Sequence, residues 1–325
     1  MVGVHLGSSD DSVTALIRDR HLGNIFLHGR SAAGVGSVRA QVSSFTSLVS
    51  PETTKGVPLL VAIDQEGGNV QAVSGPGFSE IPTALEQSRM SPDALTSAAT
   101  TWGAELATAG INLNLAPVAD LVDIANPAAN APIGYWSRQF GNTPQSVESS
   151  VESFTKGMRA SGVAVTLKHF PGLGRVTENT DLVSGVTDTV TTREDAAVRV
   201  FSAGIDHGAD LVMLSLAYYS QIDADQPAAF SQIIATDLLR NELRFTGVCI
   251  TDDLSAAAQI RPWLPPDRAI ATLDAGCDLV LVSADSSIAP EMMDAVINHA
   301  KQSPDFELKL RISAKRVLHL KENLP

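Results

Sequence analysis

The chain has 325 residues, of which 44% are hydrophobic and 18% are charged, a composition typical of a globular protein with a large buried core. The formal net charge of −13 argues against nucleic acid or an anionic membrane surface as a partner, because both bind basic patches. The same charge disfavours a polyanionic substrate, although a single local arginine suffices to bind one anionic group.

The only two cysteines, Cys249 and Cys277, lie in apolar strand-like runs, and we interpret both as buried core thiols. Their number and spacing predict no disulfide framework and no metal site, and we expect no cofactor. No apolar stretch approaches the length of a membrane span. Because the chain begins directly on a strand-like segment, we expect either a cytoplasmic protein or an exported one whose leader has been removed.

Short apolar runs alternate with longer amphipathic segments along the chain. Each run has four to six residues rich in Val, Ile and Leu, which is typical of parallel strands buried on both faces. The eight runs are Val2–His5, Asn24–His28, Leu59–Ile63, Ile111–Leu115, Val163–Leu167, Asp210–Leu214, Gly247–Thr251 and Asp278–Ser283. Since no linker divides them, eight strand-then-helix repeats predict a single (β/α)8 TIM barrel over residues 1–325.

Helix-start signals lie between these runs. Serine or threonine followed by proline opens two helices, and a threonine pair followed by acidic residues opens a third. With a closing helix at the end of the chain, the expected segments are Ser91–Ala109, Thr143–Ser161, Thr191–Gly208 and Phe306–Asn323.

Charged residues follow several of the runs, and active-site residues of such barrels lie at the carboxyl ends of the strands. The five that we expect to share one mouth are Asp64, Asp120, Lys168, His169 and Asp252. A single Asp after a strand can equally be the N-cap of the next helix, and Asp253 is better explained as a cap or a support for its neighbour. Carboxylates close to Lys and Arg suit the binding of sugar hydroxyls through charge-assisted hydrogen bonds.

Five segments resemble the signatures of glycoside hydrolase family 3, in the family's order: Ala62-Ile-Asp-Gln-Glu-Gly-Gly68, Leu115-Ala-Pro-Val-Ala-Asp120, Ser137-Arg-Gln-Phe-Gly141, Lys168-His-Phe-Pro-Gly172 and Ile250-Thr-Asp-Asp-Leu254. The resemblance extends from about Leu22 to Asp285 and is strongest to the single-domain β-N-acetylhexosaminidase branch. It implies a retaining glycosidase that cleaves terminal β-N-acetylglucosaminides, such as fragments of chitin or peptidoglycan.

By this resemblance, Asp252 is the nucleophile and forms a covalent glycosyl intermediate, and we expect Lys168 or backbone donors to keep it ionised. The residues implied to bind the hydroxyls of the sugar are Asp64, Arg138, Lys168 and His169, with Asp120 on the same rim.

The chain departs from the family in the loop after the fifth-strand signature. The hexosaminidase branch has an Asp-Ser-His element there, whose His is the general acid/base, and Asn179 and Asp181 occupy the positions of that Asp and His. A carboxylic acid can donate the proton if its pKa is raised, so we expect Asp181 to be the donor, with Glu178 as the alternative. Asn69 replaces a family Arg, and Leu216 stands where a polar residue is expected.

These departures leave three functions open. The first is a β-N-acetylhexosaminidase. The second keeps the fold and the nucleophile but cleaves β-glucosides or β-xylosides, or transfers the sugar to phosphate. The third is a sugar-binding barrel without catalysis. In each case we expect a monomer whose partner is a small carbohydrate.

Overall fold

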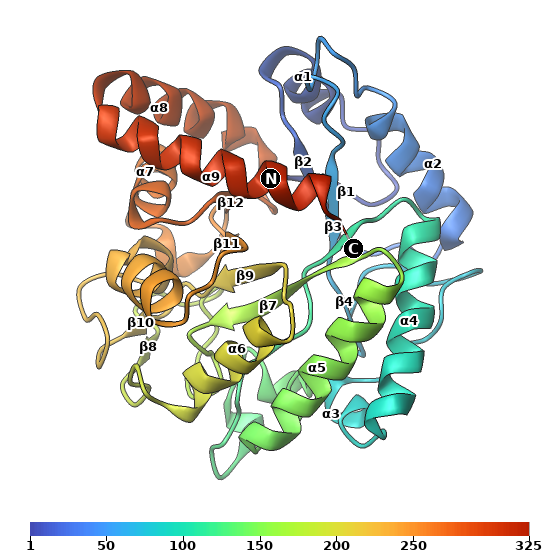
Figure 1. Ribbon diagram of the computed structural model, residues 1–325, viewed down its shortest axis with the longest axis vertical. Helices are drawn as coiled ribbons and strands as arrows, with labels where there is room; N and C mark the ends of the chain where they lie inside the picture. Colours follow the sequence, from blue (N-terminus) through green and yellow to red (C-terminus); the bar gives the residue numbers. More distant parts are fainter. Residues whose placement is uncertain (325) are drawn as a thin grey trace.

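A computed structural model describes residues 1–324, which form a barrel of eight parallel strands surrounded by helices (Figure 1). The strands, in their order around the barrel, are β1 (Val2–His5), β2 (Asn24–His28), β3 (Leu60–Ile63), β6 (Leu113–Asn114), β7 (Ala164–Phe170), β9 (Leu211–Leu214), β11 (Val248–Asp253) and β12 (Leu279–Leu281). A parallel bridge between Val2 and Val282 brings the first strand next to the last.

Helices cover the outside of the barrel and alternate with the strands. They are α1 (Asp11–Arg20), α2 (Gly34–Thr46), α4 (Pro92–Thr108), α5 (Pro144–Ala160), α6 (Ala196–Asp206), η4 (Ile233–Glu242), α7 (Pro265–Ala275) and α8 (Ala289–Gln302). Two more helices are α3 (Ala84–Gln87) and α9 (Pro304–Glu322), and the short 3-10 turns are η1 (Pro127–Ala129), η2 (Gly134–Trp136), η3 (Ala228–Phe230), η5 (Ala258–Ile260) and η6 (Ser286–Ile288). Two small strand pairs lie in the loops: β4 (Gln65–Gly67) with β5 (Val70–Gln71), and β8 (Thr187–Asp188) with β10 (Tyr218–Tyr219). Within residues 1–324, no helix is long and apolar enough to cross a bilayer.

The predicted barrel is confirmed, and its strands differ from the predicted runs mainly at their ends. One predicted helix start is wrong. The helix expected from Thr191 begins at Ala196, because Asp195 is its N-cap and accepts a hydrogen bond from the amide of Ala197 at 2.8 Å. Thr191 instead donates its amide and its hydroxyl to the carboxylate of Asp188 in the preceding loop.

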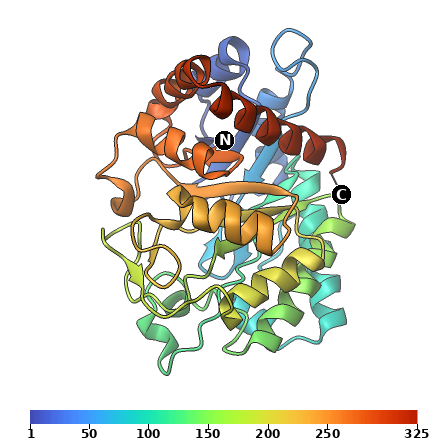
Figure 2. The same cartoon turned by 60° about the vertical axis from the view of Figure 1, so that its left-hand side comes forward.

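Alternation along the strands divides the apolar side chains into two layers. In β11, Val248 and Ile250 belong to the cluster inside the barrel, whereas Cys249 belongs to the layer between the barrel and its helices. Leu320 of α9 joins the interior cluster, and Lys321 donates to the carbonyls of Gly23 and Pro58 at 2.8 and 2.9 Å. Helix α9 therefore crosses the end of the barrel near the N terminus (Figure 1 and Figure 2).

Gly3 permits the close contact at which the barrel closes. Its amide donates to the carbonyl of Val282 at 2.8 Å. A Cβ atom at this position would lie 2.1 Å from the carbonyl oxygen of Ser283, far inside any allowed contact. The first strand therefore needs glycine at this position to reach the segment that follows β12.

A buried ion-pair cluster stabilises the end of the barrel that α9 covers. The carboxylate of Asp278 has no exposed surface and accepts hydrogen bonds from Arg240 at 2.5 Å and Arg316 at 3.0 Å. It also accepts the amide of Cys249 at 2.9 Å. One carboxylate thus links η4 and α9 to two neighbouring strands.

We predict that Asp278→Ala lowers the free energy of unfolding by about 3–5 kcal/mol, because the Arg240 guanidinium would remain buried without its partner. Asp294→Ala is the matched control, since Asp294 pairs with Arg20 at an exposed site and its loss should cost about 0–1 kcal/mol. Urea denaturation of both variants measures the difference. Equal losses for the two variants would contradict the structural role of Asp278.

Candidate active site

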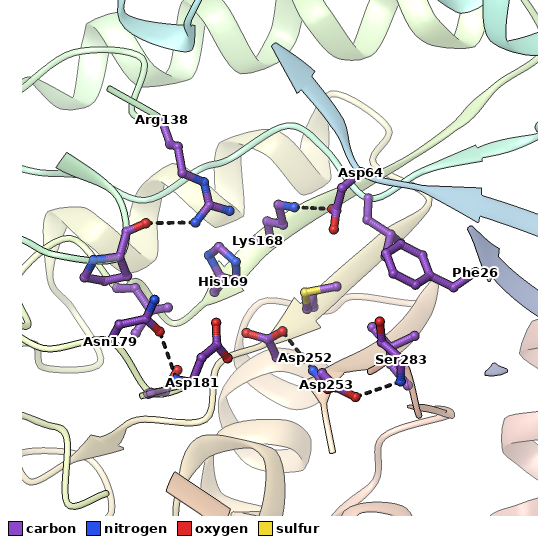
Figure 3. Close-up of a pocket in the computed structure, with 16 residues that line it drawn as sticks. Phe26, Asp64, Arg138, Lys168, His169, Asn179, Asp181, Asp252, Asp253 and Ser283 are labelled. Atoms are coloured by element: carbon purple, nitrogen blue, oxygen red, sulfur yellow. Dashed lines mark hydrogen bonds and ion pairs between the residues drawn. The ribbon is translucent and has the colours of Figure 1, made fainter. Parts of the chain in front are cut away.

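A cavity of about 160 Å3 lies at the carboxyl ends of the strands (Figure 3). Strand β3 places Asp64 in it, β7 places Lys168 and His169, and β11 places Asp252. The polar and charged lining residues are Asp64, Arg138, Lys168, His169, Asn179, Thr180, Asp181, Asp252, Asp253 and Ser283. The structure brings together six of the predicted site residues in this cavity, namely Asp64, Arg138, Lys168, His169, Asp181 and Asp252. The seventh, Asp120, does not line it.

The buried carboxylate of Glu66 organises the cationic side of this cavity. It accepts two hydrogen bonds from Arg138, one from Nε at 2.9 Å and one from Nη2 at 2.7 Å, and it pairs with Lys168 Nζ at 2.6 Å. Lys168 also donates to Asp64 at 2.6 Å. Glu66 is 4% exposed, whereas the side chain of Asp64 is 34% exposed and can meet a ligand.

The charges of this group hold one another in the ionised state. Burial alone would raise the pKa of Glu66, but Arg138 and then Lys168 outweigh it and lower that pKa to about 2. Burial likewise opposes the charge on Lys168, yet Asp64 and Glu66 raise its pKa. Lys168 is therefore a permanent ammonium group shared between two carboxylates.

Asp120 lies behind His169 and has no exposed surface. Its carboxylate contacts His169 Nδ1 at 2.7 Å and accepts the amides of His169 and Leu173 at 3.0 and 2.7 Å. Because Asp120 is buried and does not line the cavity, its position disfavours the expected direct contact with a sugar. A buried carboxylate in this position orients the imidazole of His169 toward the cavity.

The two neighbouring aspartates at the end of β11 differ in their contacts. Asp252 faces the cavity and accepts the amide of Asp253 at 2.8 Å. Asp253 accepts the amides of Ser255 and Ser283 at 3.0 and 2.7 Å, so it organises two loops, in agreement with its expected role as a cap or support. The hydrogen bond found at Asp252 comes from the backbone, whereas the ammonium of Lys168 is bonded to other carboxylates.

The loop that carries Asp181 is tied down on both sides. Asn130 donates to the carbonyls of Leu173 and Val176, each at 2.7 Å. The carbonyl of Asp181 accepts the amide of Ala258 at 3.1 Å, which joins the loop to η5 after β11. Asn179 accepts the amide of Asp181 at 2.9 Å. These contacts hold the Asp181 carboxyl in the same cavity as Asp252 (Figure 3).

The pKa of Asp181 is raised to about 6. Desolvation within the cavity is the main cause, and repulsion from Asp252 adds to it, while His169 partly opposes the change. Asp181 also has solvent-exposed surface, so water offsets part of this desolvation. Glu178, the alternative proton donor, is exposed and does not line the cavity.

Two departures from the family pattern, Asn69 and Leu216, do not line the cavity. Asn69 lines a second hollow of about 340 Å3, which shares Phe26, Asp64 and Ser283 with the first, and its carbonyl accepts a hydrogen bond from Arg30. Leu216 is fully buried in the core and does not face the cavity. Within residues 1–324, no cluster of His, Cys, Asp and Glu is arranged to hold a metal ion.

Three residues that shape the site were not among those expected from the sequence. Glu66 lies inside the quoted Ala62–Gly68 motif, so its position in the motif was a usable signal. Asn130 and Gln259 carry no such signal, although Gln259 Oε1 accepts the amide of Val186 at 2.9 Å and holds the far end of the Asp181 loop.

We predict that Glu66→Gln makes unfolding less sensitive to acid. Because the pKa of Glu66 falls from 4.5 to about 2 on folding, its ionisation stabilises the protein at neutral pH, and this contribution is lost as the pH falls from about 4.5 toward 2. The contribution is on the order of 3 kcal/mol. Guanidinium unfolding of the wild-type protein and the variant between pH 3 and 7 would measure this contribution. A difference in the free energy of unfolding that stays the same at every pH would contradict the prediction.

Residues 1–320 match the family described as Glycosyl hydrolase family 3 N terminal domain. A beta-hexosaminidase from Stenotrophomonas maltophilia (strain R551-3) is 36% identical over 272 residues, which cover 81% of this chain and 76% of that protein. The solved structure of a beta-N-acetylhexosaminidase from Beutenbergia cavernae DSM 12333 has a TM-score of 0.98 and 56% identity, over 99% of this chain and 96% of that one. A family 3 beta-N-acetylglucosaminidase from Paenibacillus sp. str. FPU-7 has a TM-score of 0.88 and 30% identity, over 99% of this chain and 60% of that one. The resemblance expected from the five motifs is confirmed, and the chain belongs to glycosyl hydrolase family 3.

Proposed function

We propose that this protein is a retaining β-N-acetylhexosaminidase that removes terminal N-acetylglucosamine from small fragments of chitin or peptidoglycan. The observation that carries this proposal is the convergence of Asp252 and Asp181 in one cavity with the paired side chains Asp64 and Lys168. Two carboxyl groups of different protonation state are what a retaining glycosidase requires. The names of the similar hexosaminidases support the choice of sugar.

In the first step, the Asp252 carboxylate attacks the anomeric carbon while protonated Asp181 donates its proton to the glycosidic oxygen. The raised pKa of Asp181 keeps a useful fraction of this group protonated near neutral pH. The bond to the leaving group breaks as the bond from C1 to Asp252 forms, and the leaving group departs as an alcohol.

In the second step, Asp181 acts as the base that takes a proton from water. Once Asp252 has become an ester it carries no charge, so its repulsion no longer raises the pKa of Asp181. The pKa of Asp181 therefore falls when a base is needed. Water attacks C1, Asp252 leaves as a carboxylate, and the sugar is released with retained configuration.

The remaining charged side chains bind and orient the sugar. Asp64, Lys168, Arg138 and His169 present charge-assisted donors and acceptors to its hydroxyl groups. Glu66 and Asp120 hold these groups in place without themselves lining the cavity.

We expect Asp252→Asn to abolish turnover of an aryl β-N-acetylglucosaminide, because an amide is a very poor nucleophile toward C1. An activated fluoro-sugar that traps the glycosyl-enzyme should label the peptide containing Asp252 in the wild-type protein, as peptide mass mapping would show. Labelling of another carboxylate would refute the assignment. Assays on nitrophenyl glycosides of other sugars, with and without phosphate, test the choice of sugar and acceptor.

We expect Asp181→Asn to slow substrates with poor leaving groups by about 10²–10⁴-fold and activated aryl glycosides much less, because only poor leaving groups need the proton. Wild-type kcat/KM should fall above pH about 6, as Asp181 loses its proton, and the variant should lack this limb.

Glu178→Gln is the matched control for Asp181→Asn, since Glu178 lies on the same loop but outside the cavity. It should keep wild-type rates and the wild-type pH profile. Equal slowing of good and poor leaving groups by Asp181→Asn would show that Asp181 does not donate the proton. We expect the protein to act as a monomer, which light scattering at assay concentration would test.

A further inference from the structure

The chain's only two cysteines lie side by side, although 28 positions separate them in the sequence. Their sulfur atoms are 2.8 Å apart. Non-bonded heavy atoms usually remain about 3.5–4.0 Å apart, and a disulfide bond is about 2.05 Å long. Both thiols are buried and free, as the sequence predicts, and the proposed reaction uses neither of them.

Backbone pairing holds the two cysteines together. Strand β11 pairs with β12 so that Ile250 lies opposite Leu279, which places Cys249 opposite Asp278 and Cys277 one residue earlier. The amide of Asp278 donates to the carbonyl of Cys249 at 2.9 Å, and the amide of Cys249 donates to the Asp278 carboxylate at 2.9 Å.

The positions of the two sulfur atoms suit a covalent bridge. Cys277 precedes β12 and lies outside the regular strand, so its side chain need not follow the alternation of β12, and it lies in the same outer layer as Cys249. Closing the distance between the sulfur atoms from 2.8 Å to that of a disulfide requires a shift of less than about 1 Å.

Both thiols are fully buried in the layer between the barrel and its helices. Burial, with the neighbouring Cys249, raises the pKa of the Cys277 thiol well above its usual range, so the reactive thiolate is disfavoured once the protein has folded. Oxidation therefore belongs to the folding process, before the helices cover these sulfur atoms. Within residues 1–324, no metal-binding cluster includes either cysteine.

We propose that Cys249 and Cys277 form an intramolecular disulfide when the chain folds in the presence of a small-molecule disulfide such as oxidised glutathione. One thiolate attacks the glutathione disulfide and releases one glutathione thiol. The second cysteine then attacks the protein sulfur of the mixed disulfide and releases the other. Two protein thiols are oxidised to one disulfide, and one glutathione disulfide is reduced to two thiols.

The bridge would stabilise the end of the barrel opposite the cavity. It closes a loop between two neighbouring strands and so reduces the conformational freedom of the unfolded chain. Cys249 lies near the start of β11, whereas Asp252 lies near its carboxyl end. The bridge should therefore raise the melting temperature and leave glycoside turnover unchanged.

The test refolds fully reduced, unfolded protein in a mixture of reduced and oxidised glutathione. Free thiols are then alkylated in denaturant, and the intact mass is measured. The expected product has lost two hydrogen atoms and carries no alkyl group, whereas protein kept in a reducing agent carries two alkyl groups. The oxidised protein should melt on the order of 5 °C higher than the reduced protein.

Cys249→Ala and Cys277→Ala serve as matched controls, because each leaves one thiol in the same place. Each variant should melt at the same temperature after refolding in either buffer. The proposal is overturned if the wild-type protein keeps two free thiols, carries glutathione on both cysteines, or melts lower when oxidised. None of these readouts depends on catalysis, so they test the disulfide separately from the proposed function.

Discussion

The ionised, buried carboxylate of Glu66 is the interaction on which the mouth of this barrel depends. It binds Arg138 through two hydrogen bonds and pairs with Lys168, so two cations that would otherwise repel each other share one small region. Burial disfavours the charge on Glu66, and the attraction of both cations exceeds that cost. Lys168 in turn holds Asp64, and the cationic side of the cavity is set before any ligand arrives.

The opposite side of the cavity depends on neutral and backbone contacts. The loop that carries Asp181 is held by Asn130 and by backbone hydrogen bonds to η5, which follows the strand that ends at Asp252. Two carboxyl groups thereby enter one cavity, Asp181 from the loop after β7 and Asp252 from the end of β11. Desolvation and the repulsion from Asp252 raise the pKa of Asp181, as the proposed role of Asp181 as proton donor requires.

The two ends of the barrel serve different purposes, as in other barrels of this kind. The end near the N terminus is covered by α9 and held by the Asp278 cluster, and the two cysteines lie beside that cluster. The carboxyl end carries the charged cavity. Strand β11 takes part in both, since Cys249 contributes to the first end and Asp252 to the second.

The sequence by itself determined the barrel, because eight apolar runs separated by amphipathic helices have few other ways to bury both faces of their strands. It also determined which strand ends carry charge, since the motifs around Asp64, Lys168 and Asp252 are local. Only the tertiary structure decided the rest: Glu66 between two cations, Asp120 behind His169, and the exclusion of Glu178 from the cavity. Each of these depends on contacts between residues distant in the chain, where burial and partner charges, rather than neighbouring sequence, set what a carboxyl group can do.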